Sequence, residues 1–524
     1  MSAATPRSSL VRAGLIVTIA VVGSRILGGL RLAIVTAVFP LGSPGLDSFL
    51  AAFTIPDFIF QLVAAGALAS ALIPIIAGLH AKNEDARAWR VASTVANLMF
   101  GTLVVLCLVV LVTAPGLVSI VASGFDPQRA AKTAELTRIM VLSPLFLAAG
   151  ALATSLLNAR DRFGAAAFSP IVYNLGIIGG ALVLAPVMGI DGVAIGVVIG
   201  SLGLVLVQLR PLWATGFRYR PVVDLSDPDA RQALRLIAPR AVGLGASQLT
   251  FVVATALLSG LTTGSISAFR LAFSVFQIPF GVIGVPIGIV ALPTMSRDLA
   301  VGDVGRYVDL IGRAMRIILF VMLPITTLGM ALRVPIVEIL FNSTTRSGID
   351  ETATALLVLL LALPSESLIA ILARAFYADR DTTTPVLAAV IAVVINTSVA
   401  ILTVSTLGVP GVAVGIVLGS VAEACFLVVR LQARTPGFRP IFLLTVGGPT
   451  LVAAAVAGGA AYVAQLVVDG MLGAPNRIGV LLELVVAGSV GCLAYLAATW
   501  ALRIAELPVF MALLRGAVRR PQRS

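Results

Sequence analysis

The sequence predicts an all-α, polytopic membrane protein of about fourteen transmembrane helices. Of its 524 residues, 59% are hydrophobic and 11% are charged, and the mean hydropathy is +1.07. A soluble globular domain carries about 25% charged residues, so most of this chain's surface suits lipid and not water. The apolar residues form long blocks, such as Ile171–Met188 and Ala388–Leu407. Such blocks are typical of helices that cross a hydrocarbon core of roughly 30 Å, and not of the alternating strands of a membrane barrel.

The net charge of +12 reflects membrane topology and does not indicate nucleic-acid binding. Of the 36 Lys and Arg residues, 26 lie in alternate connections between the apolar blocks, and six lie on the opposite side. Cytoplasmic loops carry such an excess of basic residues. We therefore expect an inner (cytoplasmic) membrane protein with an even number of spans, both termini in the cytoplasm and no nucleic-acid partner. The segments expected in the cytoplasm are 1–12, 79–90, 158–163, 210–235, 297–316, 374–381, 430–439 and 503–524.

The length of the apolar blocks and the turn residues between them place the spans. The predicted spans are 10–38, 46–79, 88–114, 133–159, 163–187, 190–212, 230–260, 264–296, 308–333, 352–378, 383–406, 409–433, 441–468 and 477–503. The three cysteines fall in apolar stretches without the spacing of a metal site, so we expect no metal and no cofactor.

An internal repeat divides the chain. Gly189–Ser201 reads GIDGVAIGVVIGS and Gly408–Ser420 reads GVPGVAVGIVLGS, with eight of thirteen positions identical at an offset of 219. Each repeat contains six spans, and an even number gives both halves one orientation. We therefore expect two six-helix lobes in parallel repeat, with a cavity between them. The predicted domains are an N-terminal lobe at 1–222, a C-terminal lobe at 223–438, and two additional helices with a basic cytoplasmic tail at 439–524.

The longest polar connection, Arg210–Arg235, separates the sixth and seventh spans. It suits an interdomain linker with an amphipathic surface segment. The tail Leu507–Ser524 is basic and suits the anionic cytoplasmic leaflet.

Four ionisable residues in or beside the spans are the candidate substrate site: Arg25, Arg31, Asp47 and Arg270. An ionisable side chain inside a membrane costs a few kcal/mol or more, so it usually faces a cavity or a partner. The planar guanidinium forks of the arginines suit phosphate, and we expect an anionic substrate such as a diphosphate. Asp47 can pair with Arg25 or Arg31 when no substrate is bound.

A second group of polar residues lies in the later spans. Asp381 and Thr397, near Asn396, can bind a coupling cation, and Glu366 and Glu423 can do the same or form contacts between helices. We expect transport to be coupled to the membrane potential or to a monovalent cation.

Several motifs resemble the MurJ/MviN family of lipid II flippases, in the multidrug/oligosaccharidyl-lipid/polysaccharide exporter superfamily. The likeness covers nearly the whole chain. The motifs are SRILGGLR at Ser24–Arg31, Asp47-Ser48-Phe49 through Ile55-Pro56, Gly66-Ala67-Leu68 with Ile73-Pro74, Ile278-Pro279 with Gly281 and Gly284, Leu292-Pro293, and FYADRDTTTP at Phe376–Pro385. The resemblance implies that Arg25, Arg31 and Asp47 line the substrate cavity.

The sequence departs from the family pattern at a few positions. The family's basic residue and glutamate in the second span are absent at Phe60/Gln61 and Ala65. Ser274 stands where the family has an arginine, and Arg270, one helical turn earlier, can substitute for it. Ala254 replaces a polar sodium ligand of some members, which argues against sodium coupling.

The resemblance implies a flippase, not an enzyme, that moves lipid II across the membrane by alternating access. That role belongs to peptidoglycan biosynthesis, cell wall biogenesis and cell shape. Its partners would be membrane lipid, the polyprenyl-diphosphate glycolipid and the cell-wall synthesis machinery, and we expect a monomer. The alternatives are a flippase for another polyprenyl-diphosphate glycan, a multidrug exporter, a membrane glycosyltransferase, or a scaffold that does not transport. Cavity arginines disfavour export of cationic drugs.

Overall fold

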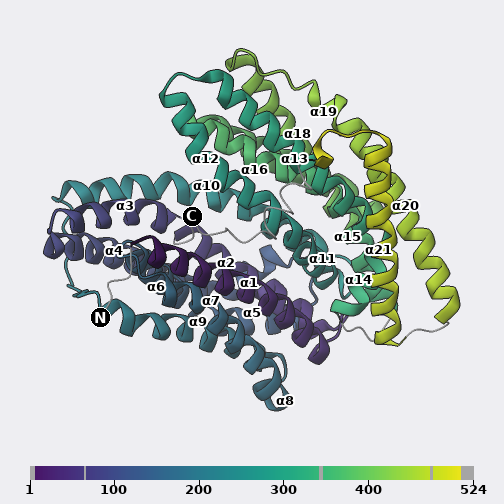
Figure 1. Ribbon diagram of the computed structural model, residues 1–524. Helices are drawn as coiled ribbons and strands as arrows, with labels where there is room; N and C mark the ends of the chain where they lie inside the picture. The colour runs from purple at the N-terminus through teal and green to yellow at the C-terminus, as the bar shows by residue number, and fades with distance from the viewer. Residues whose placement is uncertain (1–5, 64–66, 342–345, 473–475, 509–524) are drawn as a thin grey trace. The chain divides into compact units, whose positions relative to one another are not determined.

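The computed structural model describes residues 6–63, 67–341, 346–472 and 476–508, and every regular element in these ranges is helical (Figure 1). The chain forms two compact units, Met1–Ser267 with Phe341–Thr344, and Ala268–Leu340 with Thr345–Ser524. The first unit contains α1 (Pro6–Val38), α2 (Pro44–Val63), α3 (Ala67–Ala81), α4 (Asp85–Val121), α5 (Pro127–Met140), α6 (Ser143–Asn158), α7 (Phe163–Gly179), the π-helix η1 (Gly180–Leu184), α8 (Ala185–Met188), α9 (Ile190–Trp213) and α10 (Pro228–Ser259).

Helix α11 (Ser265–Pro279) starts at the end of the first unit and continues into the second. The second unit then contains η2 (Phe280–Gly284), α12 (Val285–Ala300), α13 (Val304–Ala331), α14 (Arg333–Leu340), α15 (Arg346–Leu360), α16 (Leu363–Ala378), α17 (Thr383–Leu407), α18 (Val409–Arg434), α19 (Phe442–Thr445), α20 (Gly447–Leu472) and α21 (Arg477–Ala501).

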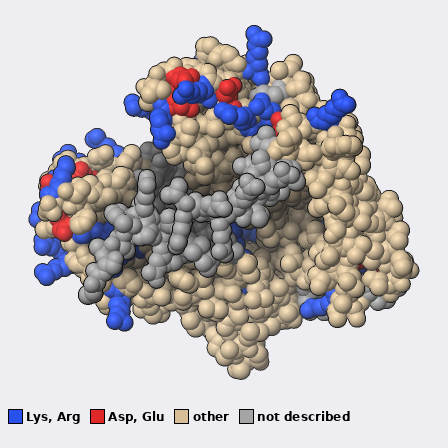
Figure 2. Space-filling model, viewed as in Figure 1, with Lys and Arg blue, Asp and Glu red and all other residues tan. Residues whose placement is uncertain are grey.

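The helices confirm the predicted class of multi-pass membrane protein. Among the described residues, 11 helices are long and apolar enough to cross a membrane, or 12 when the bent pair α15 and α16 counts as one span. Helices α1 and α10 coincide with the two remaining predicted spans. On α4, Val105, Leu108 and Val112 are 61%, 56% and 77% exposed, as expected of side chains that face lipid. Figure 2 shows wide surface areas without Lys, Arg, Asp or Glu.

The backbone repeats with the same offset as the sequence. Left-handed residues occur at three pairs of positions 219 apart: Asn83 (φ 61°) and Gly302 (φ 75°), Asp161 (φ 55°) and Arg380 (φ 60°), and Gly189 (φ 62°) and Gly408 (φ 63°). Few residues other than glycine adopt positive φ, so three coincidences in span order support a duplication. The two copies of the internal repeat begin at Gly189 and Gly408. Each of these glycines is followed at once by a helix, α9 or α18, that packs on the preceding span.

Helix α10 packs against α2, α3 and α4 of the first unit. The sequence-based domains instead put this helix in the second lobe, because the repeat counts it as the seventh span. The boundary at 222/223 stays a prediction of where the two copies of the repeat meet. The compact first unit extends further, to Ser267. The basic tail beyond Pro508 lies outside the described residues.

Candidate functional site

Asp47 is buried in the first turn of α2 and holds the start of α11. Its side chain accepts hydrogen bonds from the backbone N–H groups of Gly264, at 2.6 Å, and Ser267, at 2.9 Å. The first N–H groups of a helix have no partner within the helix, and a carboxylate there is favoured by the helix dipole. Asp47 therefore joins two segments that are more than 200 residues apart in the sequence.

Arg129 of α5 completes this contact. Its guanidinium lies 3.4 Å from the Asp47 carboxylate and donates a hydrogen bond of 3.2 Å to the Thr263 hydroxyl. The same group lies over the Phe125 ring, 4.2 Å from its centre. The prediction that Asp47 pairs with Arg25 or Arg31 is wrong for this structure. The turn after α4 brings Arg129 to the buried carboxylate, and that turn could not be placed from sequence.

Glycines bring three turns together around Asp47 and Arg129; we call this arrangement the turn cluster. It consists of the α1–α2 turn at Gly42, the α4–α5 turn at Gly124, and the α10–α11 turn from Gly260 to Gly264. A Cβ on Gly124 would collide with the Gly260 backbone, and one on Gly264 would lie 2.9 Å from the Gly42 Cα. The Gly124 N–H also donates to the Ser259 hydroxyl at 2.9 Å.

Arg25 and Arg31 lie on α1, which packs against α7. The Arg25 side chain is exposed and that of Arg31 is half-buried. The hydroxyl of Tyr173, on α7, interacts electrostatically with both Arg31 and Asp57 of α2. The Asn174 amide contacts the Ser24 carbonyl at 3.5 Å, beside Arg25. Sequence reasoning missed Tyr173 and Asp57, because one aromatic residue and one carboxylate near a span gave no pattern.

Arg270 lies on α11 in the second unit, whereas Arg25, Arg31 and Asp47 belong to the first. Its side chain is half-buried. One turn further along, the Ser274 hydroxyl donates to the Leu271 carbonyl of its own helix at 2.7 Å.

The two residues predicted to bind a coupling cation are not close together. Asp381 lies before α17 and accepts hydrogen bonds from the Thr383 and Thr384 N–H groups, each at 2.9 Å, and it forms an ion pair with Arg434. Burial opposes ionisation of Asp381, but these hydrogen bonds and Arg434 outweigh it and lower its pKa. Thr397 lies sixteen residues later, about 24 Å along the helix at 1.5 Å per residue. One ion cannot bind both side chains.

The comparisons with known proteins identify the family. The family described as "Lipid II flippase MurJ" matches residues 41–480. A probable lipid II flippase MurJ of Rhizobium meliloti (strain 1021) is 31% identical over 475 residues, which is 87% of each chain. The chain belongs to the MurJ family of lipid II flippases. The family consists of transporters, which confirms that the chain is not an enzyme.

Other MurJ proteins and solved structures agree with this assignment. The lipid II flippase MurJ of Burkholderia cenocepacia is 27% identical and covers 82% of this chain and 86% of its own length. A solved lipid II flippase MurJ in an inward closed conformation superposes with a TM-score of 0.77 at 22% identity, covering 96% of this chain and 100% of that chain. An inward-facing multidrug resistance MATE family transporter has a TM-score of 0.64 at 17% identity, over 79% of this chain and 95% of that chain. These structures support the fold.

Two of the positions at which the sequence departs from the expected MurJ pattern lie on α2 of the first unit. Phe60 and Gln61 are half-buried on α2, one turn from Asp57. The resemblance implies a basic residue at Phe60/Gln61, and this chain instead has a carboxylate nearby. Ala65 lies outside the described residues.

The second unit contains a further polar group in its spans. The Ser365 and Ser420 hydroxyls lie 2.8 Å apart, each buried. The neighbouring carboxyl groups of Glu366 and Glu423 interact electrostatically. No group of three or more His, Cys, Asp or Glu side chains that could hold a metal occurs among the residues for which side chains are described.

Proposed function

We propose that the chain moves lipid II, a polyprenyl-diphosphate glycolipid, across the cytoplasmic membrane by alternating access. The observation that carries this proposal is the closed turn cluster, in which Asp47 is buried against the α10–α11 turn while the arginines of α1 remain exposed or half-buried. The identity of the substrate is inferred from the MurJ relatives, which are named as lipid II flippases.

The charge asymmetry of the loops assigns the turn cluster to the periplasmic side, with both termini in the cytoplasm. In that orientation the turn cluster closes the periplasmic end of the first unit, and the substrate enters from the cytoplasm. Arg25 and Arg31 bind the diphosphate, and Arg270 is the third arginine expected to contact the substrate. Guanidinium groups stay ionised when partly desolvated and donate paired hydrogen bonds to phosphate oxygens.

Release requires the turn cluster to open. Asp47 and Arg129 then separate from the α10–α11 turn, and the polyprenyl tail remains in the lipid throughout. We propose that Asp47 acts as a gate residue that holds the turn cluster closed. It does not pair with Arg25 or Arg31 in place of the diphosphate when no substrate is bound.

The energy source that we propose is the membrane potential or a monovalent cation. Because Asp381 is already paired with Arg434 and lies far from Thr397, the membrane potential is the simpler source. We further propose that the chain works as a monomer and meets the cell-wall synthesis machinery at the membrane.

A second candidate substrate is another polyprenyl-diphosphate glycan. It is favoured by Asp57, a carboxylate that lies with Arg31 near Tyr173, and by Gln61, since the resemblance implies a basic residue at Phe60/Gln61.

Depletion complementation tests the proposal. The chain replaces the lipid II flippase of a bacterium that cannot grow without one, and lipid II exposure is measured on spheroplasts. Growth and exposure that match those of the native flippase support lipid II. A correctly inserted protein that restores neither would refute lipid II as the substrate and favour the second candidate.

A further inference from the structure

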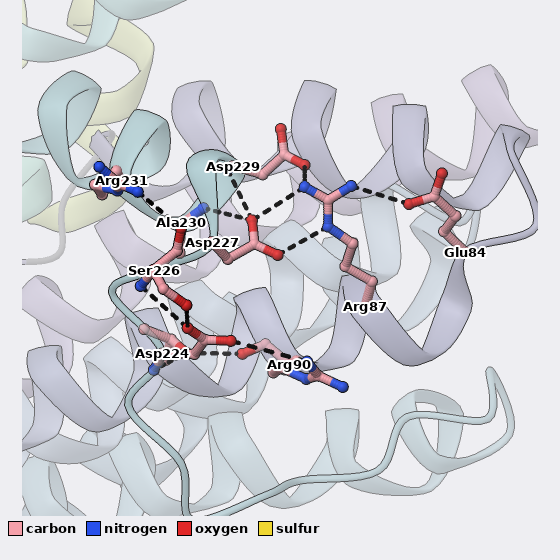
Figure 3. A network of polar contacts seen from close by, with 10 residues as sticks. Glu84, Arg87, Arg90, Asp224, Ser226, Asp227, Asp229, Ala230 and Arg231 are labelled. Carbon is pink, nitrogen blue, oxygen red and sulfur yellow. Dashed lines mark hydrogen bonds and ion pairs between the residues drawn. The ribbon is translucent and has the colours of Figure 1, made fainter.

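The linker Ala214–Asp227 between α9 and α10 is held along one face of α4 (Figure 3 shows its C-terminal end). Its backbone and aromatic side chains contact α4 at four successive positions on that face. The contacts are Trp89 edge-to-face with Phe217 at 5.3 Å, Ser93 Oγ with the Arg220 N–H at 3.0 Å, Thr94 Oγ1 with the Asp224 N–H at 3.1 Å, and Asn97 Nδ2 with the Arg220 and Val222 carbonyls at 3.2 and 2.9 Å. The linker is therefore a fixed surface of the first unit.

The acidic residues around the linker are neutralised by α4. Arg87 forms ion pairs with Glu84 at 3.1 Å, Asp227 at 2.8 Å and Asp229 at 2.7 Å. Arg90 lies 3.8 Å from Asp224. Figure 3 shows the Asp227 and Asp229 carboxylates pointing toward the Arg87 guanidinium. These carboxylates are thus unavailable to the arginines of the linker itself.

Three arginines near the start of the linker remain uncompensated. Arg210, Arg218 and Arg220 all have exposed side chains. Across the described ranges, none of the three guanidinium groups forms an ion pair or a hydrogen bond. Two aromatic residues accompany them, Trp213 at 63% and Tyr219 at 57% exposure.

The surrounding helices place these residues at the level of the lipid headgroups. Helix α9 is a candidate span that ends at Trp213, so the linker starts where the chain leaves the hydrocarbon. Helix α4 has 37 residues, or roughly 55 Å of helix against a hydrocarbon core of roughly 30 Å. Its charged first turns therefore extend beyond the core, and the linker lies along them. Tryptophan and tyrosine are enriched at this level of the membrane.

We propose that the linker is a binding surface for anionic phospholipid headgroups, with Arg218 and Arg220 as the phosphate contacts and Trp213 and Tyr219 beside them at the interface. The occupant is lipid, because the two arginines lie beside exposed aromatic side chains at the headgroup level. Because α4 fixes the linker, its arginines are preorganised for this contact. Figure 2 shows Lys and Arg side chains gathered at the end of the first unit where α3 meets α4.

Quenching of Trp213 fluorescence by brominated lipids tests the proposal. The chain has three tryptophans, so Trp89→Phe with Trp500→Phe leaves Trp213 as the single reporter in the full-length protein. The protein is reconstituted into phosphatidylcholine vesicles that contain an equal, minor fraction of brominated phosphatidylcholine or brominated phosphatidylglycerol. We expect stronger quenching by the brominated phosphatidylglycerol. Each arginine that contacts the headgroups should enrich phosphatidylglycerol around the linker by about fivefold.

The arginine variants identify the contact. In Arg218→Gln with Arg220→Gln the preference for phosphatidylglycerol should be lost, and in Arg218→Lys with Arg220→Lys it should largely remain. Added salt should weaken the preference in the parent protein. A matched control, Arg297→Gln with Arg439→Gln, removes the same charge from exposed positions of the second unit and should leave the preference intact. Equal quenching by the two brominated lipids, or a preference that survives the glutamine substitutions or is lost in the control, would overturn the proposal.

Discussion

The Asp47 carboxylate is stable in a buried position only because its oxygens accept hydrogen bonds from two backbone N–H groups and face Arg129. A buried donor without its acceptor costs about 1–3 kcal/mol. The energy of the contact is therefore divided between helix capping and charge pairing, and the two parts can be separated by substitution.

We predict that Asp47→Ala destabilises the protein more than Arg129→Ala does, since it leaves the Gly264 and Ser267 N–H groups without an acceptor. Asp47→Asn keeps one neutral acceptor, so its destabilisation should be intermediate between those of Asp47→Ala and Arg129→Ala. Thermal unfolding in detergent measures the order. A double-mutant cycle of Asp47→Ala and Arg129→Ala should give a coupling energy of about 0.5–3 kcal/mol, and additive effects would contradict the contact.

The arginines of α1 and α11 give a second prediction at this scale. Arg25→Ala, Arg31→Ala and Arg270→Ala should each reduce lipid II flipping strongly at unchanged protein level, because losing a charge-assisted contact lowers affinity by roughly one to two orders of magnitude. Arg→Lys should restore part of the activity only where a point charge suffices. If Arg270→Ala is silent while Arg25→Ala is not, the substrate site belongs to the first unit alone.

At the scale of elements, the turn cluster depends on backbones that approach without a Cβ between them. Gly124→Ala would insert a methyl group against the Gly260 backbone, and Gly264→Ala would also strain a residue at φ 107°. We predict that each lowers stability by about 1–3 kcal/mol and shifts the gate toward opening. Gly116→Ala is the control, because its Cβ meets nothing within 4 Å. The measurements are thermal unfolding and the accessibility of a cysteine introduced at the turn cluster. Equal stability and equal accessibility in all three variants would refute the close packing.

The linker gives a pH-dependent prediction at the same scale. The hydrogen bonds of Arg87 with Asp227 and of Ser226 with Asp224 lower the pKa values of both carboxyls. A carboxyl with a depressed pKa stabilises the folded state above its unfolded value of about 4, and the contribution is lost as the pH falls through the folded value. The protection factors of the Arg220 and Asp224 N–H groups, which correct for the intrinsic pH dependence of hydrogen exchange, should therefore stay high at neutral pH and fall only in acid. Arg87→Ala should lower the protection factors already at neutral pH, and protection factors that do not change with pH would contradict this account.

At the scale of the whole molecule, the bias of basic residues predicts the orientation in the membrane. Reporter fusions after Arg434 and Arg523 should both report the cytoplasm, because the cytoplasmic set of loops holds 26 of the 36 basic residues. A periplasmic signal at either position would reverse the assignment of the turn cluster to the outside.

The sequence was sufficient to predict the spans, because the cost of burying charge in hydrocarbon leaves its mark on every residue of a transmembrane helix. The repeat motif likewise predicted where α9 and α18 begin. The partner of Asp47 was beyond sequence reasoning, since it depends on how turns near Gly124 and Gly264 meet in space. The Asp381–Arg434 pair was missed for the same reason. Tyr173 was missed because a tyrosine in a membrane helix is common and gives no signal by itself.

The matched left-handed turns at Asp161 and Arg380 have an evolutionary consequence. These residues carry opposite charges, yet both have a positive φ, which few residues other than glycine adopt. Selection after the duplication therefore retained the backbone conformation at this position and allowed the side chain to change. Because six spans return the chain to its starting side, an ancestor of six spans could be fused to itself in one step. Two identical copies of that ancestor in one membrane would already have faced the same way.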